Sequence, residues 1–273
     1  MSARIDNLPS LDAVCALAEQ AGQAILEVYA REDFEVECKS DHSPLTAADL
    51  ASHRLIVDGL HALTPDIPVL SEESADIAWD TRRQWSRYWL VDPLDGTREF
   101  VKRNGEFTVN IALIDHHRSV MGVVLAPVTG DLYSASANDG AHVRREGRTS
   151  TLGTRKPASP LVVAGSRSHG SGRQAELLAN IGEYITVAMG SSLKFCLIAR
   201  GDADLYLRAG LTSEWDTAAA QCVLEQAGGA VTRLDGVPLA YNTKESLLNP
   251  EFLAVGDPRI DWSAKLVTTP SPS

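Results

Sequence analysis

The hydrophobic pattern of this chain changes near its middle, and that change constrains the fold more than any other sequence feature. Residues 11–29 and 46–63 carry apolar side chains at helical spacing, and short strand-like apolar runs follow them. Beyond residue 160, strand-like and helix-like segments alternate. The first pattern predicts two helices and a largely antiparallel sheet, and the second predicts an α/β layer.

Individual elements can be placed from the same patterns. Ser10 is a suitable N-cap for the first helix, and Thr64-Pro65 ends the second. The strands predicted in the first half cover residues 34–38, 67–70, 88–91, 108–114, 120–125 and 132–135. The second half is predicted to hold strands at 161–165, 185–188, 205–207, 230–234 and 252–255, and helices at 173–181, 193–200 and 216–226.

A short polar segment with two prolines, residues 149–160, separates the two patterns, and we expect a hinge or domain boundary there. The predicted division is an N-terminal α+β domain at 1–155 and a C-terminal α/β domain at 156–267. Residues 268–273 are predicted to be a disordered tail.

The charge balance excludes some kinds of partner. The 273 residues include 25 Lys and Arg against 36 Asp and Glu, a formal net charge of −11. This argues against nucleic-acid coating and against docking on anionic lipid, which need a basic surface. A small anionic ligand is still compatible if bound cations invert the local field. Because no secretory signal or long apolar span is evident, we expect a cytoplasmic protein without an integral membrane segment.

The four cysteines have no ligand-like spacing. Cys15, Cys196 and Cys222 lie in helical apolar patterns, and Cys38 stands apart from them. Buried free thiols are therefore favoured over a metal or disulfide role.

Two carboxylates, Asp92 and Asp95, flank a turn in the segment DPLDGT, directly after the apolar residues 88–91. Asp, Pro and Gly are common turn residues, so a plain tight turn is one interpretation. It leaves unexplained why two mutually repelling carboxylates end a buried strand. A hard divalent cation such as Mg²⁺, which prefers oxygen ligands, would convert that repulsion into attraction.

Further acidic residues could join this pair. If the strands at 67–70 and 88–91 are neighbours, Glu72 lies beside Asp92; otherwise Glu72 belongs to an ordinary solvated loop. Asp216 begins a predicted helix, as either a plain N-cap or one wall of a metal site.

Gly96 and Thr97 begin a short helical turn whose free backbone N–H groups suit a phosphate oxygen. Asp49, at the start of the second helix, could accept a hydrogen bond from the Thr97 hydroxyl and help to orient a water.

Four segments, in this order, resemble the lithium-sensitive, magnesium-dependent phosphomonoesterase superfamily, which includes inositol monophosphatases and bisphosphate nucleotidases. They are PLTAAD at 44–49, LSEES at 70–74, DPLDGT at 92–97 and WDTAA at 215–219. The resemblance spans nearly the whole chain, and DPLDGT is its most specific element. It implies a mixed α+β and α/β fold, the layered αβαβα sandwich of the inositol monophosphatase (sugar phosphatase) type, and inhibition by lithium.

The resemblance also implies roles for the residues already singled out. Two or three Mg²⁺ ions would be held by Glu72, Asp92, Asp95, Asp216 and the backbone carbonyl of Leu94, with Asp92 bridging two ions. Asp49 and Thr97 would activate the attacking water, and the backbone amides of Gly96 and Thr97 would bind the scissile phosphate. Such a site fits phosphoryl transfer, which chiefly needs positioning and charge neutralisation.

The stretch from Tyr88 to Ile114 and the segment GSSLKFCLIARGDADLY at 190–206 resemble the bacterial 3′(2′),5′-bisphosphate nucleotidases of this superfamily. By position, residues that bind substrate in related nucleotidases correspond to His169, Ser191, Lys194 and Arg208. The implied substrate-binding set adds Glu72, Leu94, Asp95, Gly96, Thr97 and Asp216. Other interpretations stay open: a solvated His169, a helix-surface Lys194, and an Arg208 paired structurally with an acidic neighbour.

The leading hypothesis is therefore a Mg²⁺-dependent enzyme that hydrolyses adenosine 3′,5′-bisphosphate to AMP and phosphate. The alternatives are an inositol monophosphatase or broad sugar-phosphate phosphatase, and a non-catalytic sensor of anionic nucleotides. The presence of both Asp49 and Thr97 argues against the sensor. The implied partner is the small-molecule nucleotide, not nucleic acid, and the protein is expected to be a monomer or homodimer. Peripheral association with the cytoplasmic face of the inner membrane is a family possibility that no basic or amphipathic segment supports.

Overall fold

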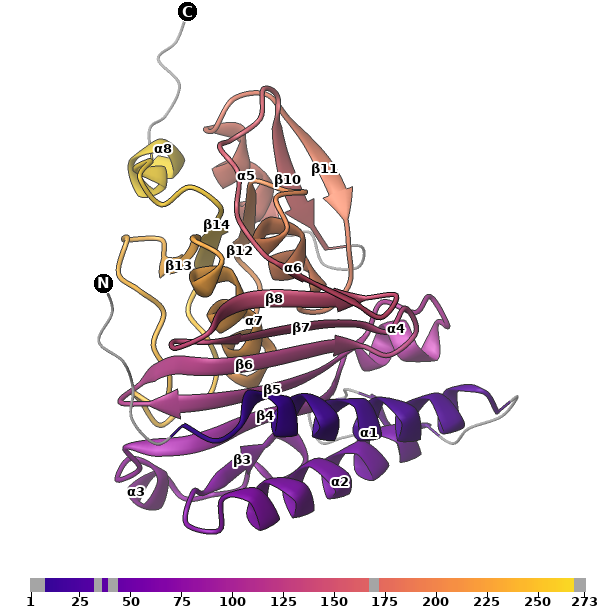
Figure 1. Cartoon of the computed structure of the whole chain (residues 1–273). Coiled ribbons are helices and arrows are strands. Elements are labelled where there is room, and N and C mark those ends of the chain that lie inside the picture. Colours follow the sequence, from indigo (N-terminus) through magenta and orange to yellow (C-terminus); the bar gives the residue numbers. More distant parts are fainter. Residues whose placement is uncertain (1–7, 32–35, 39–43, 167–171, 268–273) are drawn as a thin grey trace, which may run out of the picture.

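Helices α1 (Leu11–Tyr29) and α2 (Ala47–Leu63) form from the two segments with helical spacing. Their N-termini are capped as expected: Ser10 accepts from the backbone N–H of Ala13, and Thr46 and Asp49 form a reciprocal capping box. In the computed structural model, which describes residues 8–31, 36–38, 44–166 and 172–267, the two helices lie side by side along one face of the larger sheet (Figure 1).

The larger sheet has seven strands in sequence order, and all neighbours are antiparallel except β3 and β4, which are parallel. Its strands are β3 (Val69–Ser71), β4 (Arg87–Asp95), β5 (Thr108–Asp115), β6 (Arg118–Ala126), β7 (Asp131–Ser136), β8 (Gly140–Arg145) and β9 (Arg148–Thr151). A separate two-stranded ribbon pairs β1 (Val36–Cys38) with β2 (Pro44–Thr46).

Both faces of the larger sheet are buried at its strands β4, β5 and β6. On β4, Trp89 and Val91 pack into the core beneath α1 and α2, whereas Leu90 packs into the core shared with the second half of the chain. Strands covered on both faces carry continuous apolar runs rather than alternating ones, which is why residues 88–91 are uniformly apolar.

The second sheet has five strands in the order β11-β10-β12-β14-β13. They are β10 (Leu161–Gly165), β11 (Tyr184–Ala188), β12 (Leu205–Arg208), β13 (Ala230–Arg233) and β14 (Phe252–Val255). Helices α6 (Leu193–Ala199) and α7 (Trp215–Gln226) lie between the two sheets, and α5 (Gly172–Ala179) and α8 (Trp262–Val267) pack on the outer face of the smaller one.

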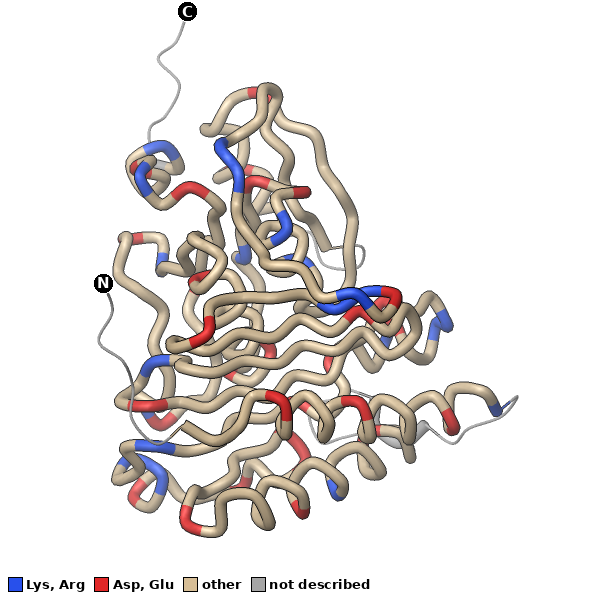
Figure 2. The backbone as a smooth tube through the Cα atoms, viewed as in Figure 1, with Lys and Arg blue, Asp and Glu red and all other residues tan. Residues whose placement is uncertain are grey.

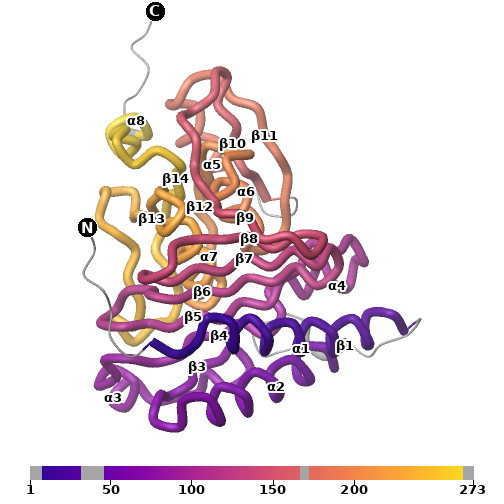
Figure 3. Tube along the Cα trace, viewed as in Figure 1, coloured from indigo at the N-terminus to yellow at the C-terminus, as the bar shows by residue number. Residues whose placement is uncertain are grey.

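Helix, sheet, helix, sheet and helix thus follow one another, so the predicted αβαβα sandwich is confirmed. Figure 3 shows the sequence division: the indigo-to-rose part of the trace builds α1, α2 and the larger sheet, and the later part builds the smaller sheet. The division into two domains at residues 155 and 156 stays a prediction.

Several short elements are absent from the sequence prediction: β2, β8, β9, the 3-10 turn η1 (Glu72–Ser74), α3 (Trp79–Arg82) and α8. β2, η1 and α3 cover only three or four residues, too few to show a helical period or a clear alternation. β9 is exposed along its whole length, so its sequence carries no apolar signal. The helical turn expected at Gly96-Thr97 is α4 (Thr97–Val101).

Other expectations can be compared with the described residues. Cys15, Cys196 and Cys222 are buried free thiols, as predicted. Lys and Arg positions are interspersed with Asp and Glu positions along both halves of the chain in Figure 2. Across the described ranges, every helix is too short or too polar to cross a membrane. His169 and the predicted tail at 268–273 lie outside the described residues.

Candidate active site

The acidic residues of the first half of the chain meet at one edge of the larger sheet, the edge formed by the C-terminal ends of β3 and β4. Strands β3 and β4 are parallel neighbours, and Ser71 pairs with Val91, so Glu72 and Asp92 both follow at the same end. The conditional expectation that Glu72 lies beside Asp92 is therefore met. Strand β4 continues through an irregularity between Asp92 and Asp95, which opens onto the same edge.

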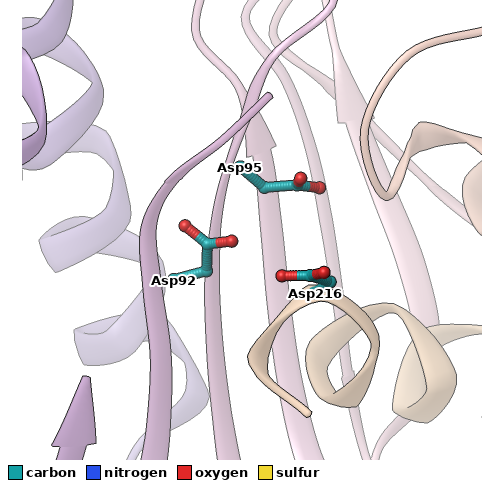
Figure 4. A group of neighbouring side chains, drawn as sticks. All are labelled: Asp92, Asp95 and Asp216. Atoms are coloured by element: carbon teal, nitrogen blue, oxygen red, sulfur yellow. The ribbon is translucent and has the colours of Figure 1, made fainter. Parts of the chain in front are cut away.

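Asp216 reaches this edge from the second half of the chain. Ligand oxygens of Asp92, Asp95 and Asp216 all lie within 4.8 Å of one another, and Figure 4 shows the three carboxylates turned toward a common centre. The N-cap of α7 is Glu214, not Asp216, so the plain N-cap interpretation of Asp216 is wrong. Its Oδ2 instead accepts the backbone N–H of Ser213 at 2.9 Å.

The electrostatics of this cluster are unfavourable without a cation. Burial, together with the charges of Glu72, Asp95 and Asp216, raises the pKa of Asp92 well above its usual value. Burial and the neighbouring Asp95 raise the pKa of Asp216 in the same way. All the candidate ligands are oxygen atoms, and such a donor set suits a hard divalent cation. The residues present therefore fit a metal site of the predicted kind.

The water-activating pair is also assembled. The Thr97 hydroxyl lies 3.3 Å from Asp49 Oδ1, which is the contact expected from the sequence, and 3.3 Å from the Leu94 carbonyl oxygen. Asp49 cannot turn away, because its Oδ2 accepts both the backbone N–H and the hydroxyl of Thr46, at 2.8 and 2.6 Å.

The turn between Asp92 and Thr97 is held by hydrogen bonds at its start. Ser52 on α2 donates its hydroxyl to the Pro93 carbonyl at 2.7 Å, and the Leu94 backbone N–H donates to Asp92 Oδ1 at 3.1 Å. Gly96 has φ +91°, a left-handed conformation that favours glycine, and it precedes α4 directly.

A pocket of about 920 Å³ opens over the carboxylates, and the cationic side chains of Lys194 and Arg208 are also among its lining residues. Its lining includes Glu72, Asp92, Leu94, Asp95, Gly96, Thr97, Ser191, Lys194, Arg208 and Asp216. All the described members of the predicted substrate-binding set thus line one cavity.

Lys194 is not a helix-surface lysine, because only 6% of it is exposed. Its ammonium group donates to the carbonyls of Ser191, at 2.5 Å, and Met189, at 3.3 Å, and lies 5.2 Å from the centroid of the Tyr206 ring. Burial lowers the pKa of Lys194 to about 8, against the opposing influence of Asp95.

Arg208 and Ser191 also line the pocket. Arg208 donates to the backbone carbonyls of Gly210 and Leu211, at 3.2 and 2.9 Å, and makes no ion pair with a described residue. The structural-pair interpretation of Arg208 is therefore not supported within the described part of the chain. Ser191 donates its hydroxyl to Asp95 Oδ2 at 2.7 Å, so it contacts the acidic cluster directly.

Some residues at the site were missed from the sequence. Ser52, Thr108, Asn110 and Ser192 are buried polar residues within two hydrogen bonds of the cluster. For Thr108 and Asn110 a signal was present: they are polar at alternate positions of an otherwise apolar strand, so both point to one face.

Comparison with known proteins agrees with this geometry. A model of the inositol monophosphatase family matches residues 6–260. The chain is 53% identical to the Escherichia coli K12 protein "3′(2′),5′-bisphosphate nucleotidase CysQ" over 244 residues, which cover 89% of this chain and 98% of the relative. The Haemophilus influenzae protein of the same name is 36% identical, over 92% of this chain and 94% of the relative.

Solved structures show the same relationship. The crystal structure of CysQ from Bacteroides thetaiotaomicron has a TM-score of 0.81 and 38% identity, covering 90% of this chain and 96% of that one. An inositol monophosphatase from Anabaena has a TM-score of 0.75 and 25% identity, covering 95% and 96%. Fold and site together define a metal-dependent phosphatase. The chain belongs to the inositol monophosphatase family.

Proposed function

We propose that this protein is a Mg²⁺-dependent 3′(2′),5′-bisphosphate nucleotidase that hydrolyses adenosine 3′,5′-bisphosphate to AMP and phosphate. The observation that carries the proposal is the pairing of two anion-binding features in one pocket. The pocket is lined both by the carboxylate cluster, which could bind a phosphate through metal ions, and by the cationic side chains of Lys194 and Arg208. A substrate with two phosphate groups would use both.

The scissile phosphate belongs beside the carboxylate cluster. Two or three Mg²⁺ ions would be held by Glu72, Asp92, Asp95, Asp216 and the Leu94 carbonyl. Bound divalent cations of this kind neutralise phosphate charge and make a nearby water more acidic. The protein contributes the fixed positions of its carboxylates and the backbone N–H groups of Gly96 and Thr97, which would donate to a phosphate oxygen.

Asp49 and Thr97 would orient the attacking water. Because the Thr97 hydroxyl donates to Asp49 Oδ1, with the two oxygens 3.3 Å apart, the Thr97 oxygen can accept a hydrogen bond from water. Asp49 is held in turn by Thr46, so this path for a proton is already arranged before substrate binds.

The second phosphate belongs beside Lys194 and Arg208. The ammonium of Lys194 and the guanidinium of Arg208 would bind it through charge-assisted hydrogen bonds, with Ser191 and His169 as further partners. The names of the relatives support this choice of substrate over an inositol phosphate, since the proteins at 53% identity are bisphosphate nucleotidases and the inositol monophosphatase from Anabaena is 25% identical.

The decisive experiment compares turnover of adenosine 3′,5′-bisphosphate and inositol 1-phosphate by the purified protein in Mg²⁺. We expect a strong preference for the bisphosphate in kcat/KM. A preference for the inositol substrate would establish the alternative enzyme, and binding of the bisphosphate without turnover would establish a sensor. The cytoplasmic location and the monomeric or homodimeric state remain predictions.

A further inference from the structure

Asp95 is held through one of its two carboxylate oxygens. Its Oδ2 accepts the Ser191 hydroxyl and the Ser192 backbone N–H, both at 2.7 Å. The Thr108 hydroxyl and the Asn110 side-chain amide approach the same oxygen at 3.5 Å. Within the described residues no donor reaches Oδ1, so that oxygen is left for a ligand in the pocket.

Ser192 is fixed by the same two residues of β5. Its hydroxyl donates to Asn110 Oδ1 at 2.8 Å and lies 2.9 Å from Thr108 Oγ1. Because Oδ1 of Asn110 accepts this bond, its Nδ2 is turned toward Asp95. Thr108, Asn110 and Ser192 are 0%, 1% and 2% exposed, so water cannot replace these hydrogen bonds.

These contacts join distant parts of the chain. Thr108 is paired with Asp95, and Asn110 with Asp92, across β5 and β4, whereas Ser192 lies just before α6. Ser191 has φ +53°, a conformation that is unfavourable for a residue with a side chain and persists only where its surroundings hold it. The orientation of Asp95, in the first half of the chain, therefore depends on contacts with the loop at 190–192 in the second half.

We propose that Thr108, Asn110 and Ser192 are positioning residues for the metal site. They fix the loop at 190–192, and the loop engages Oδ2 of Asp95 so that Oδ1 faces the cation. This inference rests on the proposed role of Asp95 as a metal ligand. Residues that orient a metal ligand typically contribute about 10-fold to 100-fold in metal affinity.

The test is direct metal binding without substrate. Mn²⁺ is titrated into the metal-free protein, and free Mn²⁺ is measured by electron paramagnetic resonance. Thr108→Val keeps the side-chain shape and removes the Thr108 hydroxyl. Ser192→Ala removes the Ser192 hydroxyl. We expect each to weaken Mn²⁺ binding by about 10-fold. Thr108→Ser, which restores a hydroxyl, should recover most of the affinity.

Ser136→Ala is the matched control. Ser136 is also fully buried and donates its hydroxyl to a carboxylate, that of Asp139, but it lies on β7 away from the cluster. This variant should lose stability without losing Mn²⁺ affinity. If Thr108→Val and Ser192→Ala bind Mn²⁺ as tightly as Ser136→Ala does, the positioning role is wrong.

Asp95→Asn separates this inference from the proposal on which it rests. If Asp95→Asn binds Mn²⁺ as tightly as the unchanged protein, Asp95 is not a ligand and the proposed metal site fails. If Asp95→Asn weakens binding while the Thr108 and Ser192 variants do not, only the positioning role fails. Should Ser192→Ala not fold, the Thr108→Val and Thr108→Ser pair still gives the answer.

Discussion

Gly122 lies directly against the backbone carbonyl of Ala219. A Cβ at position 122 would come within 2.2 Å of that oxygen, so no side chain fits. Gly122 is in the middle of β6, and Ala219 is on α7, one turn after Asp216. This close approach sets how deeply α7 lies on the sheet, and therefore where Asp216 meets Asp92 and Asp95.

Replacing Gly122 should disturb both stability and the site. We expect Gly122→Ala to lower the free energy of unfolding by about 3 kcal/mol, since the clash is with backbone that cannot turn aside. Turnover should fall as well, because relief of the clash moves α7. Urea denaturation checks the first effect. Gly153→Ala is the control, since a Cβ there meets nothing within 4 Å; equal destabilisation by both variants would contradict this role of Gly122.

Asp95→Asn should abolish turnover and leave the fold intact. The change removes a ligand charge from the cluster, but an asparagine oxygen can still accept from Ser191 and Ser192. We expect kcat to fall by about 10²-fold or more, with an unchanged circular dichroism spectrum. Ordinary activity at ordinary Mg²⁺ concentration would count against the site assignment.

Thr97→Val should reduce kcat far more than it raises KM. The substitution keeps the shape of the side chain and removes the hydroxyl that links the water to Asp49. Loss of a group that assists proton transfer costs about 10²-fold or more in rate. Steady-state kinetics check this, and Asp49→Asn should give a similar loss. A change confined to KM would mean that Thr97 only binds substrate.

The affinity for a bisphosphate should depend on pH through Lys194. Burial lowers the pKa of Lys194 to about 8, so this residue is charged at neutral pH and loses its proton as pH rises through that value. We therefore expect kcat/KM for the bisphosphate, which reports the free enzyme, to fall above about pH 8. Profiles measured between pH 6.5 and 9.5, roughly, cover the transition.

Lys194→Ala provides the comparison for that profile. The variant should show a raised KM for adenosine 3′,5′-bisphosphate and no decline assignable to this group above pH 8. Its KM for a nucleoside 3′-monophosphate should change much less, since that substrate lacks the second phosphate. Equal effects on both substrates would contradict a second-phosphate role.

Much of the fold could be read from local patterns. Helix α1 has the predicted bounds, and α2 begins directly after Thr46, because apolar spacing and capping residues act over a few positions. The predicted strand positions also lie close to the observed ones. The pairing of the strands could be stated only as a condition, because the sequence of a strand does not say which neighbour it pairs with.

The candidate site was predictable in its residue types but not in its assembly. Two carboxylates after a buried strand already favoured a bound cation, and the order of the four segments implied the family. The sequence could not show that Ser191 and Ser192 would contact Asp95, or that Lys194 would be buried. Those facts depend on α6 and α7 packing against the larger sheet, through contacts between residues far apart in the chain.

By itself, the sequence determined most of the longer elements, the excess of acidic residues and the chemical groups that the site would contain. The tertiary structure alone decided which of these carboxylates lie close together and which oxygen of Asp95 is available to a ligand. It also decided that Lys194 and Arg208 line the same pocket. The physical reason is range: helical periods and caps act between near neighbours, whereas a buried charge is stabilised only by groups that folding brings to it.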